Sequence, residues 1–251
     1  MTVPATPSFR LDGRRAIVTG AGRGIGLAAA AALAEAGANV TLVSRTLSEV
    51  EAAAAQIGKG ATAAMIDVSD IAAVKAFFAG HAAFDILVNN AGTNRPKPMW
   101  GVTEEDYDAV FDLNVRSAFF VAQACAQGMI ADGVKGSLIH MSSQMGHVGG
   151  PNRSLYCGSK WALEGISKAF ALDLATHGIR SNTIAPTFIE TPMTKPFFED
   201  PAFKTHVLSK IKLGRIGKVE DLMGAILFLA SDASALMTGT SLIIDGGWTA
   251  D

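Results

Sequence analysis

The sequence predicts an α/β fold in which helices cover both faces of a parallel sheet. Short apolar segments rich in strand-forming residues alternate along the chain with longer segments of helical pattern. The apolar segments are continuous and lack the polar–apolar alternation of strands with one solvated face, which indicates strands that are buried on both sides. Hydrophobic residues make up 49% of the 251 positions, which is enough to fill the core that such a sheet requires.

Seven strands and six helices are predicted in alternation. The strands are the short, strongly apolar segments, namely Ala16–Thr19, Asn39–Ser44, Ala61–Asp67, Ile86–Asn89, Ser137–Ser142, Ser181–Ala185 and Ser241–Ile244. The helices are the longer segments between them, namely Gly24–Ala36, Ser48–Ile57, Asp70–His81, Thr103–Ala131, Leu155–His177 and Val219–Ser231. No repeat, linker or low-complexity stretch interrupts this order, so we expect residues 1–251 to form a single domain.

Residues that favour helix ends support these bounds. Thr46 precedes the second predicted helix and Glu49 follows three positions later, a spacing that predicts a capping box in which Glu49 reaches back to the amide of Thr46. Gly37 and Gly178 follow the first and fifth predicted helices, where glycine often forms the C-terminal cap.

One long segment, residues 186–217, departs from the alternation of strands and helices. It contains four prolines and, close to them, four phenylalanines, namely Pro186, Pro192, Pro196 and Pro201 with Phe188, Phe197, Phe198 and Phe203. Long insertions of this kind in compact domains are usually functional. We therefore predict that residues 186–217 form a lid over a substrate.

The composition argues against several classes of protein. A formal net charge of −2 does not suit a general nucleic-acid-binding protein. The only cysteines, Cys125 and Cys157, lie far apart and the five histidines do not cluster, so we expect no disulfide framework, no metal and a reducing compartment. Met1–Arg15 lacks the apolar segment of a signal peptide, and no uncharged apolar run reaches the ~18 residues of a membrane span. We expect a cytoplasmic protein without nucleic-acid or membrane partners.

A glycine-rich turn joins the first predicted strand to the first helix. Gly20, Gly24 and Gly26 have the spacing G-x3-G-x-G, with Arg23 and Ile25 between them. Glycines at such a turn permit a tight bend, close approach of the backbone to a pyrophosphate and close packing of helix on strand. The helix then presents free N–H groups and the positive end of its dipole to the anion.

A phenol and an amine lie near each other in the fifth predicted helix. Tyr156 and Lys160 are four positions apart, so their side chains share one face of the helix. An ammonium close to a phenol favours the phenolate, so we expect Lys160 to lower the pKa of Tyr156 from about 10 towards a value useful for acid–base catalysis. Ser143 follows the fifth predicted strand, at the edge where open α/β sheets bind ligands, and its hydroxyl is expected to hold a substrate oxygen against Tyr156.

Together and in this order, the glycine loop and the Ser143, Tyr156 and Lys160 set resemble the short-chain dehydrogenase/reductase family. The resemblance covers nearly the whole chain, from Leu11-Asp12-Gly13 to Asp245-Gly246-Gly247. It implies a Rossmann-type, doubly wound sheet of about seven parallel strands. It also implies hydride transfer between a nicotinamide cofactor and a secondary alcohol or ketone.

The resemblance implies specific roles for the matching residues. The catalytic residues would be Asn114, Ser143, Tyr156 and Lys160, with Tyr156 transferring the proton, Lys160 also holding the nicotinamide ribose, and Asn114 bending its helix and holding a water. The cofactor would contact Gly20, Arg23, Gly24, Ile25, Gly26, Arg45, Asp67, Val68, Asn89, Ala91, Gly92, Tyr156, Lys160, Ile189 and Thr191.

The end of the second strand predicts which nucleotide binds. Sites selective for NAD(H) place an acidic residue there to bind the ribose 2′-hydroxyl, but this strand ends Val43-Ser44-Arg45-Thr46. Arg45 and Arg23 would suit a 2′-phosphate, since a guanidinium binds phosphate well. NADP(H) is therefore favoured, with NAD(H) as the alternative.

Several substrates remain open at this stage. Asn94-Arg95-Pro96-Lys97-Pro98 resembles gluconate 5-dehydrogenases of the family, and Arg95 or Lys97 could pair with a carboxylate. The expected pocket also includes Gln144, Met145, Asn152, Thr187, Phe188 and the lid residues Pro192–Phe198. Thr187 stands where the family usually has glycine. A 3-oxoacyl-carrier-protein reductase is one alternative, and a nucleotide-sensing regulator without catalysis is another. The resemblance further implies a homotetramer whose interfaces use the two long helices and the last strand.

Overall fold

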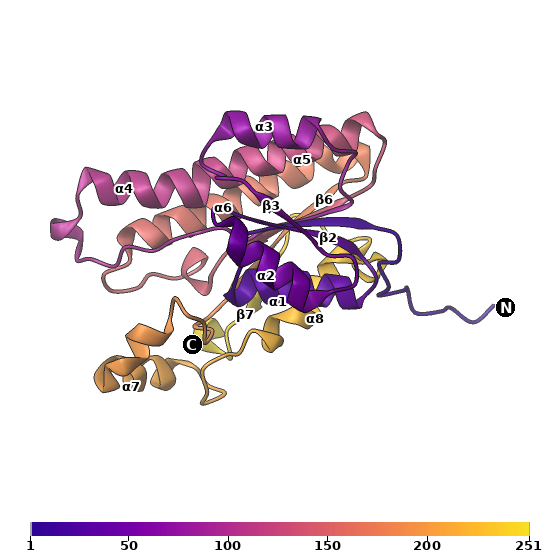
Figure 1. Ribbon diagram of the computed structural model, residues 1–251. Helices are drawn as coiled ribbons and strands as arrows, with labels where there is room; N and C mark the ends of the chain where they lie inside the picture. Colours follow the sequence, from indigo (N-terminus) through magenta and orange to yellow (C-terminus); the bar gives the residue numbers. More distant parts are fainter. Residues whose placement is uncertain (1, 251) are drawn as a thin grey trace.

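The computed structural model describes residues 2–250, and its centre is one sheet of seven parallel strands in the order β3-β2-β1-β4-β5-β6-β7 (Figure 1). The strands are β1 Arg15–Thr19, β2 Asn39–Ser44, β3 Thr62–Met65, β4 Ile86–Asn89, β5 Ser137–Met141, β6 Arg180–Pro186 and β7 Ser241–Ile244. The order runs outward in both directions from β1 and β4, which is the doubly wound Rossmann arrangement that was predicted. Ligands of such sheets bind at this reversal, beyond the carboxyl ends of the strands.

Helices cover both faces of the sheet, as predicted. They are α1 Gly24–Glu35, α2 Leu47–Ile57, α3 Ile71–Ala79, α4 Glu104–Phe111, α5 Ala118–Ala131, α6 Ser154–Leu174, α7 Pro201–Lys210 and α8 Glu220–Ala230. Helices α1 and α8 pack together on one face, while α3 and α5 pack together on the other (Figure 1). The side chains of Ala29 and Ala30 on α1 are fully buried, and their small size lets the helix lie close to the sheet.

Two local predictions need correction. Glu49 does not close a capping box, because the side chain of Thr46 makes no capping hydrogen bond and Glu49 lies near Arg23 instead. A capping box forms at Thr103, whose hydroxyl accepts a hydrogen bond from the amide of Asp106 while the Asp106 carboxylate accepts one from the amide of Thr103. The third strand is also shorter than the expected Ala61–Asp67.

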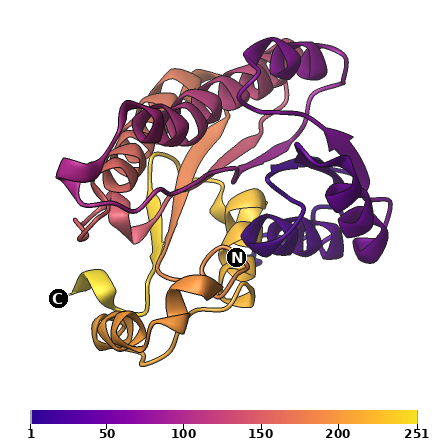
Figure 2. The ribbon, with the colours of Figure 1, turned by 60° about the vertical axis from the view of Figure 1, so that its left-hand side comes forward.

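The segment that departs from the alternation contains a helix that was not predicted. The side chain of Asp200 caps α7 and Pro201 occupies its first turn, a combination that favours helix initiation. Helix α7 lies outside the two layers that cover the sheet (Figure 2). None of the helices within residues 2–250 is long and apolar enough to cross a bilayer.

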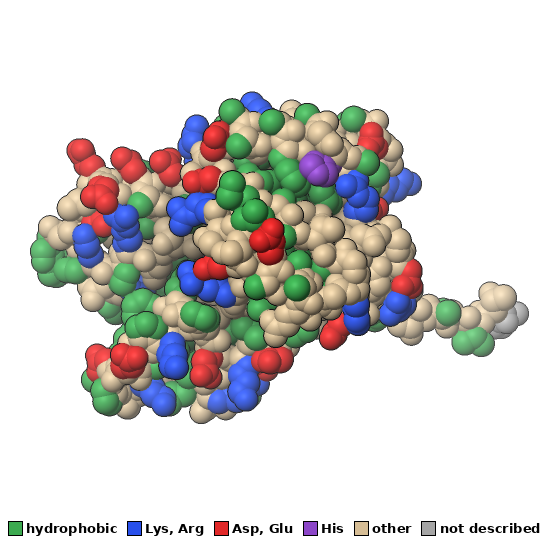
Figure 3. Space-filling view, in the orientation of Figure 1, with side chains coloured by type: hydrophobic (Ala, Val, Ile, Leu, Met, Phe, Trp, Pro, Cys, Tyr) green, Lys and Arg blue, Asp and Glu red, His purple; other side chains and the backbone are tan. Residues whose placement is uncertain are grey.

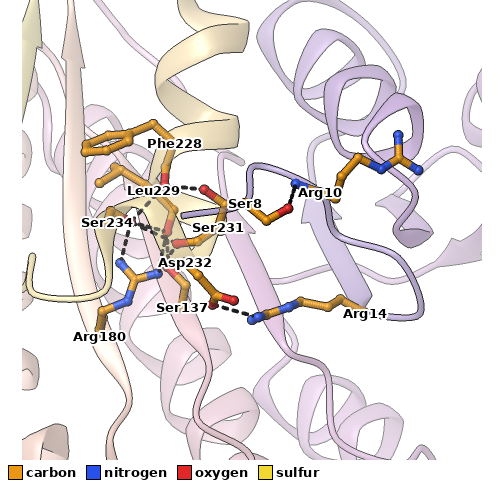
Figure 4. Close-up of polar contacts among 10 residues, drawn as sticks. All are labelled: Ser8, Arg10, Arg14, Ser137, Arg180, Phe228, Leu229, Ser231, Asp232 and Ser234. Carbon is orange, nitrogen blue, oxygen red and sulfur yellow. Dashed lines mark hydrogen bonds and ion pairs between the residues drawn. The ribbon is translucent and has the colours of Figure 1, made fainter. Parts of the chain in front are cut away.

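The amino edge of the sheet is tied together by Arg180 (Figure 4). Its guanidinium donates hydrogen bonds to the carbonyl of Leu229 at 2.7 Å and to the hydroxyl of Ser234 at 2.9 Å. Ser137 at the start of β5 also donates to the Leu229 carbonyl, at 2.8 Å. These bonds satisfy carbonyls at the end of α8 that have no partner within the helix.

Candidate active site

A cleft of about 260 Å³ opens where the order of the strands reverses, beyond the carboxyl ends of β1, β4, β5 and β6. Eleven of the residues predicted for the site line it, namely Gly20, Arg23, Gly24, Ile25, Ala91, Gly92, Ser143, Tyr156, Lys160, Ile189 and Thr191. Segments that are far apart in the sequence thus meet in one place. The predicted residues outside the lining are Gly26, Arg45, Asp67, Val68, Asn89 and Asn114.

The glycine loop forms the nucleotide end of the cleft. Gly20 and Gly24 have φ angles of 63° and 58°, a left-handed conformation that favours glycine. A Cβ at Gly26 would collide with the carbonyl oxygen of Gly20, so Gly26 serves the packing of helix on loop. Arg23 at the start of α1 provides no side-chain cap, which leaves the first N–H groups of the helix free for an anion. The loop therefore fits the pyrophosphate of a dinucleotide.

Asparagines of the Asn89–Gly92 segment connect this loop to β4. Asn90 lines the cleft and donates hydrogen bonds to the carbonyls of Thr19 at 3.0 Å and Gly20 at 3.2 Å. Asn89 is buried beneath the cleft and donates to the carbonyl of Ala118 at 2.7 Å. Asn89 thus braces β4 against α5, while Asn90, which was not among the expected cofactor contacts, lines the cleft.

Ser143, Tyr156 and Lys160 converge on the opposite side of the cleft. Ser143 follows β5, and its hydroxyl donates to the side-chain oxygen of Gln144 at 2.9 Å and lies near enough to the phenol of Tyr156 to affect its pKa. Lys160 is buried, and its ammonium donates to the carbonyl of Met141 at 2.8 Å and lies 5.5 Å from the centroid of the Tyr156 ring. The three side chains face the same space, as expected for groups that act on one substrate oxygen.

Asn114 lies in a π-helical segment, Asp112–Ser117, that interrupts the predicted long helix between α4 and α5. Its side-chain amide donates to the carbonyl of Thr93 at 2.9 Å and to the hydroxyl of Ser159 at 3.0 Å, and its oxygen accepts from the amide of Thr93 at 2.8 Å. Single π-helical turns are frequent at functional sites. Here the turn directs Asn114 towards the wall of the cleft. There its hydrogen bonds join Thr93, which lines the cleft, to Ser159 of α6.

The expected depression of the Tyr156 pKa is not what the structure shows. Burial raises the pKa of Tyr156, and the hydrogen bond with Ser143 and the charge of Arg153 oppose that rise only in part. Burial also lowers the pKa of Lys160 to about 8, against the opposing charge of Glu164. The correction arises because loss of hydration outweighs charge attraction at this depth. At neutral pH the phenol is protonated and can donate a proton.

The adenosine end of the predicted site is open to solvent. Arg45 and Asp67 are exposed, and the charge of Arg45 contributes to a lowered pKa of Asp67, after the larger effect of the Ser69 hydrogen bond. The Asp67 carboxylate accepts hydrogen bonds from the amide and hydroxyl of Ser69, at 2.9 and 2.6 Å. Val68 is buried below it. Arg23 lies 3.9 Å from Glu49, so its charge is only loosely paired.

The cations expected to meet an anionic substrate are instead paired with acids. Arg95 is 3.0 Å from Glu105 and 3.3 Å from Asp106, and Lys97 is 2.5 Å from Asp106. Acidic and basic side chains lie side by side over this part of the surface around α4 (Figure 3). Arg95 is absent from the lining of the cleft. The basic side chain that does line its substrate side, Arg153, was not predicted, because an arginine before a helix gives no sign in the sequence that it will be buried.

Aromatic residues of the segment 186–217 close one side of the cleft. Phe188 packs against Phe198, Phe203 and Trp248, with ring centroids 5.5 to 6.0 Å apart. Phe188 and Phe197 line the cleft, together with Thr187, Gln144 and Met145 as expected, whereas Asn152 does not.

Within residues 2–250 no group of three His, Cys, Asp or Glu side chains could hold a metal ion.

A family model described as enoyl-(acyl carrier protein) reductase matches residues 20–249 of this chain. L-xylulose reductase of Bos taurus is 40% identical over 242 residues, which cover 96% of this chain and 99% of that protein. The chain belongs to the short-chain dehydrogenase/reductase family. It is therefore an NAD(P)-dependent oxidoreductase that acts on a secondary alcohol or the corresponding ketone.

Other members of the family that are similar to this chain handle sugar acids. Gluconate 5-dehydrogenase of Gluconobacter oxydans is 37% identical over 248 residues, which cover 96% of each chain. A crystal structure of a gluconate 5-dehydrogenase from Burkholderia cenocepacia, in complex with NADP and tartrate, matches with a TM-score of 0.94 and 39% identity over 99% of this chain and 100% of that one. The chain thus resembles both ketose reductases and sugar-acid dehydrogenases.

Proposed function

We propose that this enzyme uses NADP(H) to interconvert a secondary hydroxyl and a ketone on a small polyhydroxylated substrate. The observation that carries the proposal is the convergence of Ser143, Tyr156 and Lys160 on a cleft whose other end is the uncapped start of α1. One end of such a cleft suits phosphates, and the other suits a reacting carbon–oxygen bond. The ketose reductases and gluconate dehydrogenases among its relatives support a sugar or sugar-acid substrate.

The residues at the reacting end would act in a defined order. NADPH, when bound, supplies hydride to the carbonyl carbon. Tyr156, protonated at neutral pH because its pKa is raised, donates its proton to the carbonyl oxygen. Ser143 holds that oxygen in place by a hydrogen bond. In the direction of oxidation, the same side chains would remove the proton from the alcohol.

Lys160 and Asn114 would support this proton transfer. The buried ammonium of Lys160 stabilises negative charge that develops on the Tyr156 oxygen, and it is placed to bind the ribose next to the nicotinamide. Asn114 holds Thr93 and the helix that carries Tyr156 and Lys160 in a fixed relation. Asn114 would also hold the water through which Lys160 is reprotonated.

Preference for NADP(H) would arise from Arg23 and Arg45. Both guanidinium groups are exposed near the end of β2, where no acidic side chain follows the strand. Relatives support this assignment, since a carbonyl reductase [NADPH] of Sus scrofa is 36% identical to the chain and NADP is bound in the similar Burkholderia cenocepacia structure. The other expected cofactor contacts, Asp67 and Val68 at the adenine and Ile189 and Thr191 at the nicotinamide, complete this proposal.

The proposal is tested by steady-state rates with a panel of substrates and both cofactors. The panel comprises L-xylulose, erythrulose, 5-ketogluconate, D-gluconate, D-glucitol and a 3-oxoacyl thioester, each with the phosphorylated and unphosphorylated nicotinamide cofactor. We expect turnover of ketoses or keto acids with NADPH. A thousandfold preference in kcat/KM for the thioester would identify an acyl reductase instead, and no turnover of any compound would favour a nucleotide-sensing regulator.

We further infer a homotetrameric assembly in the cytoplasm. Trp161 and Leu172 of α6 are 53% and 79% exposed, and Ile243 of the edge strand β7 is 44% exposed. Apolar side chains at such positions favour burial against another subunit. Cys125 and Cys157 are free thiols, which suits a reducing compartment. Light scattering at micromolar concentration should give four times the mass of the chain, and a monomer would contradict the assembly.

A further inference from the structure

Arg153 is a buried cation on the substrate side of the cleft. The residue is 8% exposed, lines the cleft, and precedes Tyr156 by three positions. The contact described for its guanidinium is with the ring of Phe197 in the lid, whose centroid lies 5.4 Å away. Among residues 2–250 no hydrogen bond or ion pair to another side chain or carbonyl satisfies this guanidinium, unlike the guanidinium of Arg180.

A cation in this position is unfavourable for two reasons. Charged groups are rarely buried without a partner, because the lost hydration is not replaced, and burial accordingly lowers the pKa of Arg153. Arg153 also occupies the amino end of α6, a helix of 21 residues, where the helix dipole repels positive charge. An anion bound beside Arg153 would remove both penalties, since it would pair with the guanidinium and face the positive end of the helix dipole.

The backbone holds Arg153 in this position. Asn152 has a φ angle of 59°, a conformation uncommon outside glycine, and its carbonyl accepts a hydrogen bond from the amide of Lys97 at 3.1 Å. A Cβ at Gly150 would lie 2.8 Å from Met145 and 3.5 Å from the Arg153 side chain, so glycine is needed for this packing. Strained or closely packed backbone of this kind is often retained where it serves a site.

No other group competes for an anionic part of the substrate. The ammonium of Lys160 is bonded to the Met141 carbonyl, and Arg95 and Lys97 are neutralised by Glu105 and Asp106. The lining of the cleft, as described within residues 2–250, contains no aspartate or glutamate. The hydroxyl of Thr187, also on the cleft, is a buried polar atom without a partner in the described chain.

We propose that Arg153 is the residue that selects a substrate carrying a carboxylate, and that it binds this carboxylate while Tyr156 and Ser143 hold the reacting oxygen. The inference rests on the proposed function and deepens it, because it favours a hydroxy or keto acid over the neutral sugar of the same length. A guanidinium suits a carboxylate particularly well because it can form two parallel hydrogen bonds with it.

A matched pair of ketones tests the selection directly. 5-Ketogluconate and L-sorbose differ only in a carboxylate that replaces a primary alcohol. We expect the unmodified enzyme to prefer 5-ketogluconate, and we expect Arg153→Gln to lower the ratio of its kcat/KM to that for L-sorbose by about 10–100-fold. A ratio of the two ketones cancels any effect of the lost charge on Tyr156, because both substrates depend on the same proton donor. Arg153→Lys should restore part of the loss. Arg95→Gln is the control, and it should leave the preference between the two ketones unchanged.

A structural role for Arg153 would give a different pattern. If Arg153 only stabilised the lid, Arg153→Gln would weaken both ketones alike, and that result would overturn the proposal. Thermal unfolding and NADPH binding by fluorescence establish whether each variant is folded. Should Arg153→Gln fail to fold, Arg153→Met, which keeps the contact with Phe197 and removes the charge, serves in the same comparison.

Binding experiments separate this proposal from the proposed function. Tartrate carries two carboxylates where threitol carries two primary alcohols, and the two compounds are otherwise alike. Their affinities for the NADP⁺-loaded protein can be measured by calorimetry. Suppose that the unmodified protein binds tartrate, that Arg153→Gln does not, and that the unmodified protein turns over none of the panel. That result would support the anion site and overturn the proposed function. If the unmodified enzyme turns over sugars, and Arg153→Gln has the same affinity for tartrate and the same preference between the two ketones, the proposed function stands and the role of Arg153 is overturned. Absence of turnover together with tartrate binding that does not depend on Arg153 would overturn both.

Discussion

Two arginines at opposite edges of the sheet show how this molecule separates structure from function. Arg180, at the amino edge, donates hydrogen bonds to Leu229, Ser231 and Ser234 (Figure 4). It also donates to the carbonyl of Met237 at 3.4 Å. Arg153, at the carboxyl edge, has only the ring of Phe197 against its guanidinium. Burial lowers the pKa of both arginines, so burial alone does not distinguish them.

The difference lies in the partners that each edge supplies. At the amino edge the carbonyls that end α8 meet the donors of Arg180 and Ser137, so the polar groups satisfy one another. At the carboxyl edge the hydroxyl of Thr187 has no partner in the described chain, the first amides of α1 have no side-chain cap, and the guanidinium of Arg153 contacts only the ring of Phe197. Buried polar groups in proteins are nearly always paired, so a concentration of unpaired ones marks the place where a ligand completes the pairing.

The largest expected effect at the carboxyl edge is on catalysis. Tyr156→Phe removes the proton donor and should lower kcat by about 10²–10⁴-fold or more, while cofactor binding and the unfolding temperature remain nearly unchanged. Steady-state kinetics and nucleotide fluorescence would measure this. Tyr107→Phe is a matched control, because Tyr107 is the only other tyrosine, is 49% exposed and stacks on Phe111. Near-native turnover of Tyr156→Phe would refute the catalytic assignment.

One pair of variants tests whether the two arginines differ in their contribution to stability. Arg180→Met removes the four hydrogen bonds that the guanidinium donates at this edge and should lower the free energy of unfolding by about 2–4 kcal/mol. Arg153→Met removes an unpaired charge, so in the absence of ligand it should leave stability unchanged or raise it. Chemical denaturation of both variants measures the difference. Equal losses in the two would show that the edges do not differ in the way proposed here.

The pH dependence of stability tests the buried charge at Lys160. Its pKa in the folded protein is about 8, against 10.5 for the free side chain, so between these values the unfolded chain binds more protons. The free energy of unfolding should therefore rise as the pH goes from about 8 to 10.5. This gain, which comes from deprotonated Lys160, is lost again as the pH falls through the folded pKa of about 8. The shift corresponds to roughly 3 kcal/mol. Unfolding of the native protein and of Lys160→Met at pH 7.5 and 10 should show this rise in the native protein alone.

The smallest expected effect belongs to the exposed end of the carboxyl edge. Arg45→Asp replaces a cation after β2 with an acid, and it should move the ratio of kcat/KM values at least tenfold from NADPH towards NADH. Lys59→Asp, an exposed exchange of the same charge after α2, should leave that ratio unchanged. An unmodified enzyme that already favours NADH by tenfold would contradict the assignment of Arg23 and Arg45.

Much of the fold and part of the site followed from local patterns. The strands β2, β4 and β7 have the predicted bounds, because short apolar runs rich in strand-forming residues mark the strands of a parallel sheet. Helix α7 was not predicted, because its apolar residues do not follow a helical period and the prolines that precede it are typical of a loop. Gly20, Gly24, Ser143, Tyr156 and Lys160 all line the cleft, because their spacing relative to strand ends determines where they emerge.

The sequence by itself thus determined the doubly wound sheet, and it placed Gly20, Gly24, Ser143, Tyr156 and Lys160 where they meet at one cleft, because each of them belongs to a local pattern of strand, turn or helix. Only the tertiary structure decided the partners of polar groups that come from distant segments. It paired Arg95 with Glu105 and Asp106, left Arg153 unpaired in the cleft, and placed Asn90 rather than Asn89 at its surface. It also raised the pKa of Tyr156 where the Tyr156–Lys160 spacing predicted a fall, because hydration is lost through the packing of the whole molecule and not through any local pattern.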